Sequence, residues 1–320
     1  MSEPKAFDVI TAGEAMALFM ASAPGALENV RDFHMGASGA ELNVAIGLAR
    51  LGFRVGFLSR VGGDVFGRFL METLAREGVS DEHVSIAPQQ STGFMLKSLV
   101  GGGDDAEIDY YRRGSAASHL GLGDYPPGFC ARARHLHLTG ISPALSGSTR
   151  ELVFHLAREA RTTGCIVSFD PNLRPRLWPS QEAMTTCLNE LASLSDLVLP
   201  GLSEARTLTG FDTPTDIASF YLDRGVRQVV VKLGPAGAYY ASVDGSGSVA
   251  APAVAEVVDT VGAGDGFATG VISALLEGLP LQEAVMRGNL IGSRVIQFQG
   301  DSDGLPTRRE LAAFAADLTS

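Results

Sequence analysis

The stretch VDTVGAGDGF, residues 258–267, predicts an extended segment that turns through glycines directly into a helix. Apolar residues recur at helical spacing after it, and Gly278 followed by Pro280 marks the expected end. Gly262 and Gly264 lack a Cβ, so their backbone can lie against a ligand. Because the N–H groups at a helix start have no intrahelical partner and lie at the positive end of the helix dipole, this stretch predicts an anion-binding site.

Asp265 is the unusual residue of this stretch, since it puts a carboxylate where an anion should bind. Aspartate is a preferred capping residue, so residue type alone favours a structural role at the helix start. The alternative is that the carboxylate acts as a general base on a ligand that the amides hold. The residues in neighbouring loops decide between these two roles.

Length and composition restrict the protein class. The chain has 320 residues, a net charge of −11 and three cysteines without metal-type spacing, so we expect free thiols in a reducing compartment. The negative charge argues against nucleic acid or an anionic membrane as partner, and an anionic substrate would need locally placed arginines. No apolar run reaches the length of a membrane span, and the N-terminus does not resemble a secretory signal. These features predict a cytoplasmic protein.

Short apolar runs alternate with helical patterns along most of the chain. This rhythm predicts a parallel sheet with helices on both faces. It breaks between residues 92 and 113, where two β-like runs flank a glycine-rich segment and predict a hairpin. We therefore predict one α/β domain, residues 1–320, with a doubly wound central sheet (α/β/α). A small β-sheet lid is expected from segments near residues 15–35 and 91–113.

Polar residues follow several of the expected strands. In an open parallel sheet, ligands bind beyond the carboxyl ends of the strands. The side chains expected at this edge are Asp170, Asn172, Arg174, Glu204, Lys232 and Asp265. Carboxylates, an arginine and a nest of glycine amides suit phosphoryl transfer, in which acids hold Mg²⁺ and an aspartate accepts the proton of the attacking hydroxyl. The chain has neither a Gly-Lys-Ser/Thr loop nor a G-x-G-x-x-G turn, so P-loop and Rossmann nucleotide sites are not expected.

Two motifs resemble the signatures of the ribokinase / phosphofructokinase-B family of sugar kinases. The segment DTVGAGDGF at 259–267 resembles the second signature, and SGAELN at 38–43 with VGGDVFG at 61–67 resembles the first. Ser38 stands where a glycine is common, and a capping box with Glu41 explains it. The resemblance covers essentially the whole chain, including the lid. It implies a ribokinase-like fold, ATP and Mg²⁺ as cofactors, and a sugar substrate; a monovalent cation and a homo-oligomer are further features that it suggests.

The resemblance also implies a role for each matching residue. Asp265 would be the base, with the hole for the transferred phosphate formed by the amides of Gly262, Ala263 and Gly264. The implied substrate-binding residues are Gly39, Asn43, Tyr110, Arg112, Arg174 and Asp265. The nucleotide would contact Asn172, Ser203, Lys232, Gly234, Gly237, Gly262, Gly264 and Asn289, and Glu204 would be the metal ligand. Gly201 stands where the family usually has an asparagine three residues before that glutamate, which puts the mode of Mg²⁺ binding in question.

Three stretches most resemble the branch of the family that phosphorylates 2-keto-3-deoxygluconate, a sugar acid. They are YYRRGSAAS at 110–118, FDPNLRPRLW at 169–178 and GDSDGLPT at 300–307. An arginine fork matches a carboxylate, and the resemblance brings Arg112 from the lid and Arg174 from the core. In the alternative interpretations, Arg174 binds an ATP phosphate and Arg112 is a surface charge.

We expect ATP-dependent phosphorylation of the terminal hydroxyl of that sugar acid. One alternative is a kinase of the same family that acts on a neutral sugar, of the fructokinase or ribokinase type. The other is a sugar-binding regulator that has lost catalysis, and the intact segment from Gly262 to Asp265 speaks against it.

Overall fold

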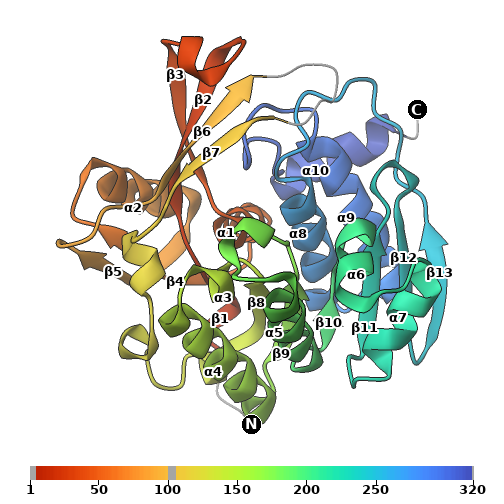
Figure 1. Ribbon diagram of the computed structural model, residues 1–320. Helices are drawn as coiled ribbons and strands as arrows, with labels where there is room; N and C mark the ends of the chain where they lie inside the picture. Colours follow the sequence, from red (N-terminus) through yellow and green to blue (C-terminus); the bar gives the residue numbers. More distant parts are fainter. Residues whose placement is uncertain (1–4, 100–105, 319–320) are drawn as a thin grey trace.

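Two β-sheets organise the chain in the computed structural model, which describes residues 5–99 and 106–318. The larger sheet has nine strands in the order β13-β12-β11-β10-β9-β8-β1-β4-β5, and the smaller has four in the order β3-β2-β6-β7. Figure 1 shows the smaller sheet projecting from the body of the molecule beside one edge of the larger one. The predicted α/β fold with a small second sheet is therefore confirmed.

Seven neighbouring strands of the large sheet run parallel, and the two strands at one edge are antiparallel. The strands are β1 Phe7–Ala12, β4 Val55–Gly62, β5 Val79–Ala87, β8 Ala133–Thr139, β9 Ile166–Asp170, β10 Leu197–Val198, β11 Gln228–Lys232, β12 Ala238–Ser242 and β13 Gly245–Val249. Strand β5 had no counterpart in the sequence prediction, because its residues carry several charges and lack a continuous apolar run.

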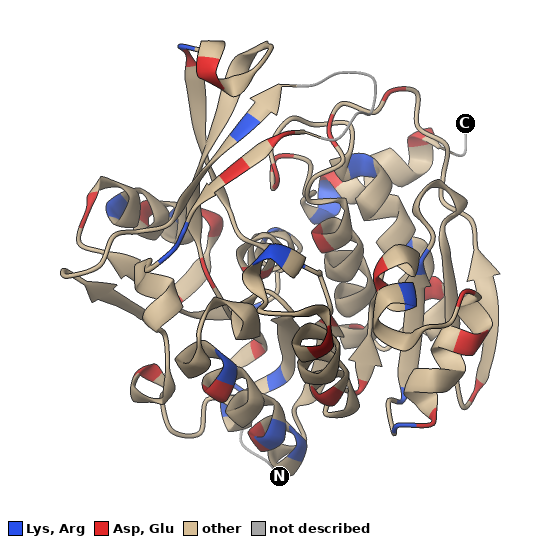
Figure 2. Cartoon of the chain, in the orientation of Figure 1, with Lys and Arg blue, Asp and Glu red and all other residues tan. Residues whose placement is uncertain are grey.

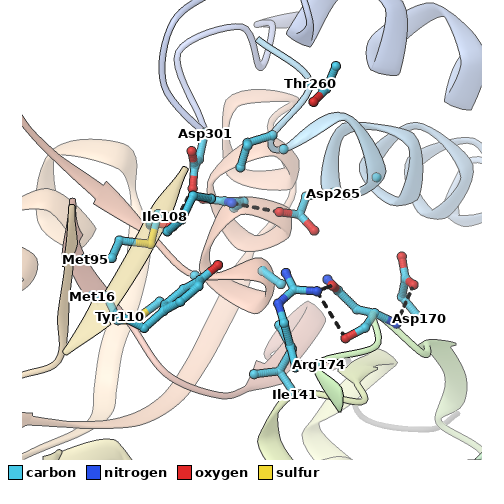
Figure 3. Close-up of a pocket in the computed structure, with 18 of the residues that line it drawn as sticks. Met16, Met95, Ile108, Tyr110, Ile141, Asp170, Arg174, Thr260, Asp265 and Asp301 are labelled. Atoms are coloured by element: carbon cyan, nitrogen blue, oxygen red, sulfur yellow. Dashed lines mark hydrogen bonds between the residues drawn. The ribbon is translucent and has the colours of Figure 1, made fainter. Parts of the chain in front are cut away.

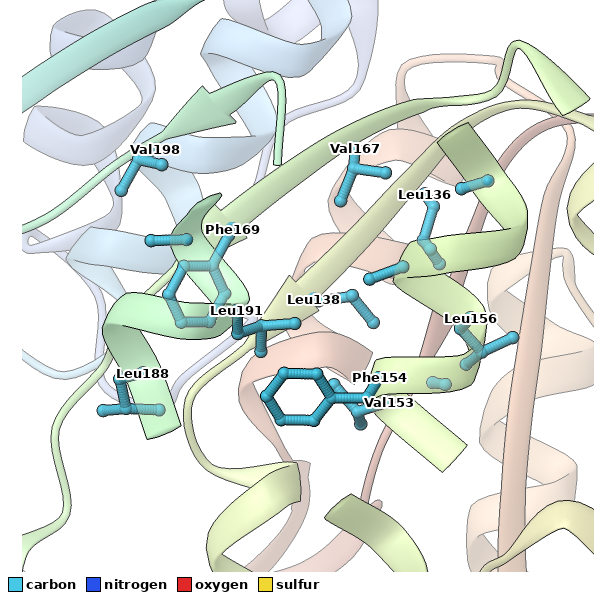
Figure 4. Packing of buried hydrophobic residues seen from close by; sticks show 14 of the residues in the cluster. Leu136, Leu138, Val153, Phe154, Leu156, Val167, Phe169, Leu188, Leu191 and Val198 are labelled. Carbon is cyan, nitrogen blue, oxygen red and sulfur yellow. The ribbon is translucent and has the colours of Figure 1, made fainter. Parts of the chain in front are cut away.

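Helices cover both faces of this sheet. Strand residues alternate between two apolar clusters, so that Ile10 packs on one face and Val9 on the other. Figure 4 shows part of the first cluster. This cluster contains residues of α4 Gly147–Thr163, α5 Gln181–Ser193, α6 Leu202–Thr209 and α7 Pro214–Leu222. The second includes α1 Ala40–Arg50, α2 Val65–Glu77, α8 Ala263–Leu276 and α9 Leu281–Val295. The short α3 Ser142–Leu145 and the C-terminal α10 Arg308–Asp317 complete the described α-helices.

The small sheet contains β2 Met16–Pro24, β3 Phe33–Ser38, β6 Phe94–Leu99 and β7 Ile108–Tyr111. Strands β6 and β7 pair antiparallel, as the hairpin prediction required, and residues 100–105 between them lie outside the described part of the chain. Strand β2 joins the two segments by pairing parallel to β6. Its buried face is narrow, with Met16, Leu18 and Met95 as the core.

Helices α8 and α9 pack closely because glycines lie at their contact. A Cβ on Gly270 would stand 2.6 Å from the carbonyl oxygen of Arg287, and one on Gly288 would stand 2.8 Å from a methyl group of Val271. Such distances leave no room for a side chain, so the backbones approach each other directly. The position of α8 is therefore fixed along its length by α9.

Two local expectations were wrong. Ser38 does not cap a helix: it ends strand β3, and its hydroxyl donates to Asp301 at 2.5 Å, while Glu41 is buried and accepts from Thr139 and Ser142. The other error concerns Gly262, which we expected to follow a strand. The segment 250–262 contains neither helix nor strand and leads into α8 as a loop.

Charges of both signs are spread over the helices and loops, as Figure 2 shows. Within residues 5–99 and 106–318, no helix combines the length and apolar character that a membrane crossing requires.

Candidate active site

A cavity of about 420 Å³ lies between the small sheet and the carboxyl edge of the large sheet. Lid residues that line it include Met16, Met95, Ile108, Tyr110 and Arg112. From the core it is lined by Gly39, Asn43, Asp170, Asn172, Arg174, Glu204, Lys232, Gly262, Gly264, Asp265 and Asp301, among others. Figure 3 shows the labelled side chains of Tyr110, Arg174 and Asp265 directed toward this shared space. The structure thus brings together most of the residues predicted from the sequence.

The start of α8 forms one wall of the cavity. Gly262 has φ 83°, a conformation that favours glycine, and its missing Cβ leaves room for the backbone of Asp301. The N–H of Ala263 donates to the carbonyl of Thr260 at 3.3 Å. No backbone acceptor is found in the described residues for the N–H groups of Gly264 and Asp265. These two amides are therefore available to an anion at the positive end of the helix.

Asp265 is buried, with an exposed fraction of 8%, and its carboxylate accepts a hydrogen bond from the Asn43 amide at 2.7 Å. Its pKa is raised to about 8, chiefly by burial; the Asn43 hydrogen bond lowers this pKa, and the charges of Asp170 and Asp301 raise it. A carboxylate with a pKa of about 8 is a stronger base than an ordinary carboxylate, so its ionised form, which predominates above that pH, can accept the proton of an alcohol. The side-chain oxygen of Asn43 is buried and has no protein partner among the described residues, so it can accept from a ligand hydroxyl.

Lys232 and Asp170 form an ion pair that also lines the cavity. The lysine ammonium donates to the carboxylate at 2.6 Å, and the two residues end strands β11 and β9, which flank β10 in the large sheet. The ammonium is also only 3.5 Å from the place that a Cβ on Gly264 would occupy. A fixed cation therefore lies beside the helix start, where it adds to the attraction for a phosphate group.

Arg174 reaches the cavity from the loop after β9. Its guanidinium donates to the side-chain oxygen of Asn172 at 2.5 Å and to the Leu173 carbonyl at 3.0 Å. Asn172 holds a φ of 39°, which turns the chain so that both side chains line the cavity. Arg174 has no ion pair within the described chain, so its positive charge is available to a ligand.

Arg112 reaches the cavity from the lid, but its charge is compensated. It pairs with buried Glu14, with the guanidinium Nε at 2.7 Å from the carboxylate, and Ser115 donates to the same side chain at 2.5 Å. The guanidinium also lies over the ring of Tyr110, 5.7 Å from its centroid. It can therefore orient a ligand through hydrogen bonds while contributing little net charge. Arg112 is only 7% exposed, which excludes the surface-charge interpretation.

Glu204 faces the cavity with its carboxylate already hydrogen-bonded to backbone. It accepts from the N–H groups of Leu173 and Gly201 at 2.7 and 2.8 Å. Among the described residues there is no cluster of three or more His, Cys, Asp or Glu arranged to hold a metal. This donor set fits Mg²⁺, which usually keeps several waters and binds through one or two carboxylates together with substrate phosphates.

Some predicted residues do not line the cavity. Ala263, Ser203, Gly234, Gly237 and Asn289 are absent from its wall. Ser203 is exposed at the start of α6, and Asn289 donates to the carbonyls of β13 and the residue after it. Apart from Ala263, these residues were predicted to contact the nucleotide, so that part of the prediction lies outside the cavity.

The sequence prediction also missed buried charges beneath the cavity. Glu14, Glu41, Lys97 and Asp301 are each no more than 3% exposed and were not assigned to the site. Glu14 and Lys97 lie in or beside apolar strands, where a charged residue is rarely buried unless it is paired. That position is the sequence signal that could have identified them.

Comparisons with known proteins identify the family to which the chain belongs. The family model described as "pfkB family carbohydrate kinase" matches residues 7–308. The chain belongs to the pfkB family of carbohydrate kinases. The predicted family and the predicted enzyme class, a carbohydrate kinase, are therefore confirmed.

Individual members of the pfkB family match over nearly their whole length. The chain is 48% identical to a 2-dehydro-3-deoxygluconokinase of Bacillus subtilis (strain 168), over 96% of this chain and 95% of that protein. It is also similar to the crystal structure of a PfkB protein from Polaromonas sp. JS666, with a TM-score of 0.89, 50% identity and coverage of 96% and 100%. A putative ribokinase II from E. coli, solved in complex with ATP and Mg²⁺, matches with a TM-score of 0.88, 26% identity and coverage of 97% and 99%.

Proposed function

We propose that this pfkB carbohydrate kinase transfers the terminal phosphoryl group of ATP to the terminal hydroxyl of 2-keto-3-deoxygluconate, also called 2-dehydro-3-deoxygluconate. The observation that carries the proposal is that the Asp265 carboxylate and the Arg174 guanidinium line one cavity without an ion pair among the described residues. A sugar acid has a carboxylate at one end and a hydroxyl at the other, which matches these two groups. The similarity to the Bacillus subtilis enzyme supports the same substrate.

In the proposed reaction, Asp265 accepts the proton of the terminal hydroxyl as its oxygen attacks phosphorus. Asn43 holds the carboxylate by donating to one oxygen, which leaves the other free for the substrate. The free amides at the start of α8 stabilise the negative charge on the transferred phosphoryl group, and Lys232 adds a positive charge beside them. These groups are fixed before the substrate binds, so little reorganisation is needed during the reaction.

At the other end of the substrate, Arg174 binds the carboxylate. Arg112 and Tyr110 approach from the lid and contact the sugar. Gly39 lines the same space from the core, where its missing Cβ leaves room for the backbone carbonyl of Glu14. Arg112 is held by Glu14, so its contribution is the direction of its hydrogen bonds. Discrimination against neutral sugars then comes mainly from the charge of Arg174.

The nucleotide is proposed to lie along Lys232, with Asn172, Ser203, Gly234, Gly237 and Asn289 as its further contacts. Glu204 would hold Mg²⁺ through its remaining lone pairs, and Mg²⁺ supplies charge neutralisation at the phosphates. A homo-oligomeric state stays a prediction and can be measured by analytical ultracentrifugation.

The test is a comparison of ATP-dependent phosphorylation of 2-keto-3-deoxygluconate, fructose and ribose by the same preparation. We expect the highest kcat/KM for the sugar acid, with the phosphate on its terminal carbon as located by NMR of the product. A neutral sugar with the highest kcat/KM would establish the alternative, a kinase of the fructokinase or ribokinase type. Arg174→Ala should then leave the neutral-sugar rate unchanged, which separates the two assignments.

A further inference from the structure

Lys97 belongs to lid strand β6, but its charged end lies in the core. The side chain is only 3% exposed, and its ammonium forms ion pairs with Asp259 and Asp301, at 2.8 Å from Oδ1 of Asp301. Asp259 lies three residues before Gly262 in the loop that enters α8, whereas Asp301 lies in the segment after α9. One buried ammonium therefore connects the small sheet to two separate core loops.

Asp259 and Asp301 both contact the turn that leads into α8, Asp259 through its carboxylate and Asp301 through its backbone. Asp259 Oδ1 accepts the backbone N–H of Val261 at 3.0 Å, which fixes the turn immediately before Gly262. The backbone of Asp301 occupies the space that a side chain on Gly262 would need. Asp301 also accepts from Ser38 at the end of β3 and lines the cavity. The atoms around the lysine are thus the ones that hold the amides of the proposed anion hole in place.

Charge balance shows why a cation is needed at this point. Two carboxylates share the site with one ammonium, and both are buried, at 6% and 3% exposure. Burial opposes the charged form of Lys97, but the charges and hydrogen bonds of Asp301 and Asp259 outweigh it and raise its pKa. Without the ammonium, the carboxylates would repel each other beside Gly262.

We infer that Lys97 is a positioning residue for phosphoryl transfer: its ammonium is a fixed internal cation that holds the loop of the anion hole in register with the lid. The inference rests on the proposed role of the amides at the start of α8. A lysine in a strand of the lid also makes the geometry of the hole depend on the position of the lid. In this chain a side chain therefore supplies the cation that orders the loop, and no dissociable monovalent cation is required there.

Two substitutions of Lys97 form a matched pair for the test. Lys97→Met fills the space with an apolar side chain, and Lys97→Ala leaves a space that a small cation can enter. We expect kcat to fall about ten- to a hundredfold in both, with KM for the sugar acid changed less than about threefold, because a displaced hole affects the transition state more than sugar binding. Potassium or methylammonium chloride should restore kcat several-fold in Lys97→Ala only.

Three controls make the outcome decisive. The wild type and Lys5→Met, which loses a lysine far from the site, should respond to the added salts by less than about twofold, whereas a general salt effect would act on every variant alike. Thermal melting shows whether each variant is folded. A folded Lys97 variant with kcat within about twofold of wild type overturns the inference. So does a folded Lys97→Ala whose lost kcat does not respond to either cation.

The double variant Lys97→Met/Asp259→Asn covers the case in which an unpaired carboxylate prevents folding. It removes one charge of each sign, and the asparagine oxygen can still accept from Val261. If the pair acts as a unit, the double variant should lose no more kcat than the more affected single variant; multiplicative losses would overturn the inference. If Asp265→Asn keeps wild-type activity, the proposed reaction itself is wrong. Failure of the proposed function can therefore be distinguished from failure of the inference about Lys97.

Discussion

The lid side and the core side of the cavity differ in how their charges are balanced. On the lid side, Arg112 is paired with Glu14, and Lys97 is paired with two carboxylates. On the core side, Lys232 is paired with Asp170, but Asp265 and Arg174 line the same space without an ion pair in the described residues. The difference indicates that the lid contributes shape and directed hydrogen bonds, whereas charges left unbalanced on the core side are matched by the ligand.

The largest effect is expected from removing the unpaired carboxylate of Asp265 on the core side. Asp265→Asn keeps the shape of the side chain and a possible contact with Asn43 but cannot accept the proton. We expect kcat to fall on the order of 10²- to 10⁴-fold, the usual contribution of a general base. Steady-state phosphorylation assays on the folded variant measure it. Turnover near the wild-type value would show that Asp265 is not the base.

On the lid side, where the charges are paired, substitutions should lower the free energy of unfolding. Glu14→Gln leaves the Arg112 guanidinium buried without its counter-ion, and breaking a buried pair in this way costs about 3–5 kcal/mol of unfolding free energy. Denaturant unfolding of the variant measures the loss. The double variant Glu14→Gln/Arg112→Met should recover much of it, because no orphan charge remains. A Glu14→Gln protein as stable as wild type would contradict the assigned compensation.

Arg174→Ala tests the unpaired cation of the core side. Charged hydrogen bonds contribute about 1.5–3 kcal/mol, so we expect kcat/KM for the sugar acid to fall about 10- to 100-fold. Most of the loss should appear in KM, because the carboxylate is bound equally in the ground and transition states. Isotherms for ATP analogues serve as the control. A loss confined to nucleotide binding would favour the alternative in which Arg174 contacts the phosphates.

The pH dependence of kcat/KM sharpens the comparison further. The pKa of Asp265 is raised to about 8 by burial, so the group is protonated below that pH and ionised above it. Activity should therefore rise with pH, by about tenfold per unit well below the pKa, and level off above about 8. A pH–rate profile for the free enzyme measures this. A profile that is flat between pH 5 and 8 would contradict the assignment of Asp265, with its raised pKa, as the base.

The sequence predicted those parts of the fold and site that depend on local patterns. The alternation of strands and helices and the hairpin of β6 and β7 both follow from residues that are close together in the chain. The glycines at the start of α8 likewise mark the proposed anion site without any knowledge of tertiary contacts. These features are encoded within a few residues, so they can be inferred from one sequence.

The missed features depend on partners that are distant in sequence. Glu14 meets Arg112 across 98 residues, and Lys97 meets Asp301 across 204. Ser38 and Glu41 have the spacing of a capping box, but tertiary partners engage both side chains instead. Which charges are neutralised inside the protein is therefore decided only when the two sheets come together.

The glycine contact between α8 and α9 extends the active site beyond what a ligand could touch. A methyl group at Gly270 or Gly288 would force the two helices apart, and the shift of α8 would displace the amides at its start, which are proposed to bind phosphate. In a survey that scores growth or turnover for every substitution, these glycines would rank beside the substrate contacts. Inherited variation at them would be read as a catalytic defect, although no reactant ever approaches either residue.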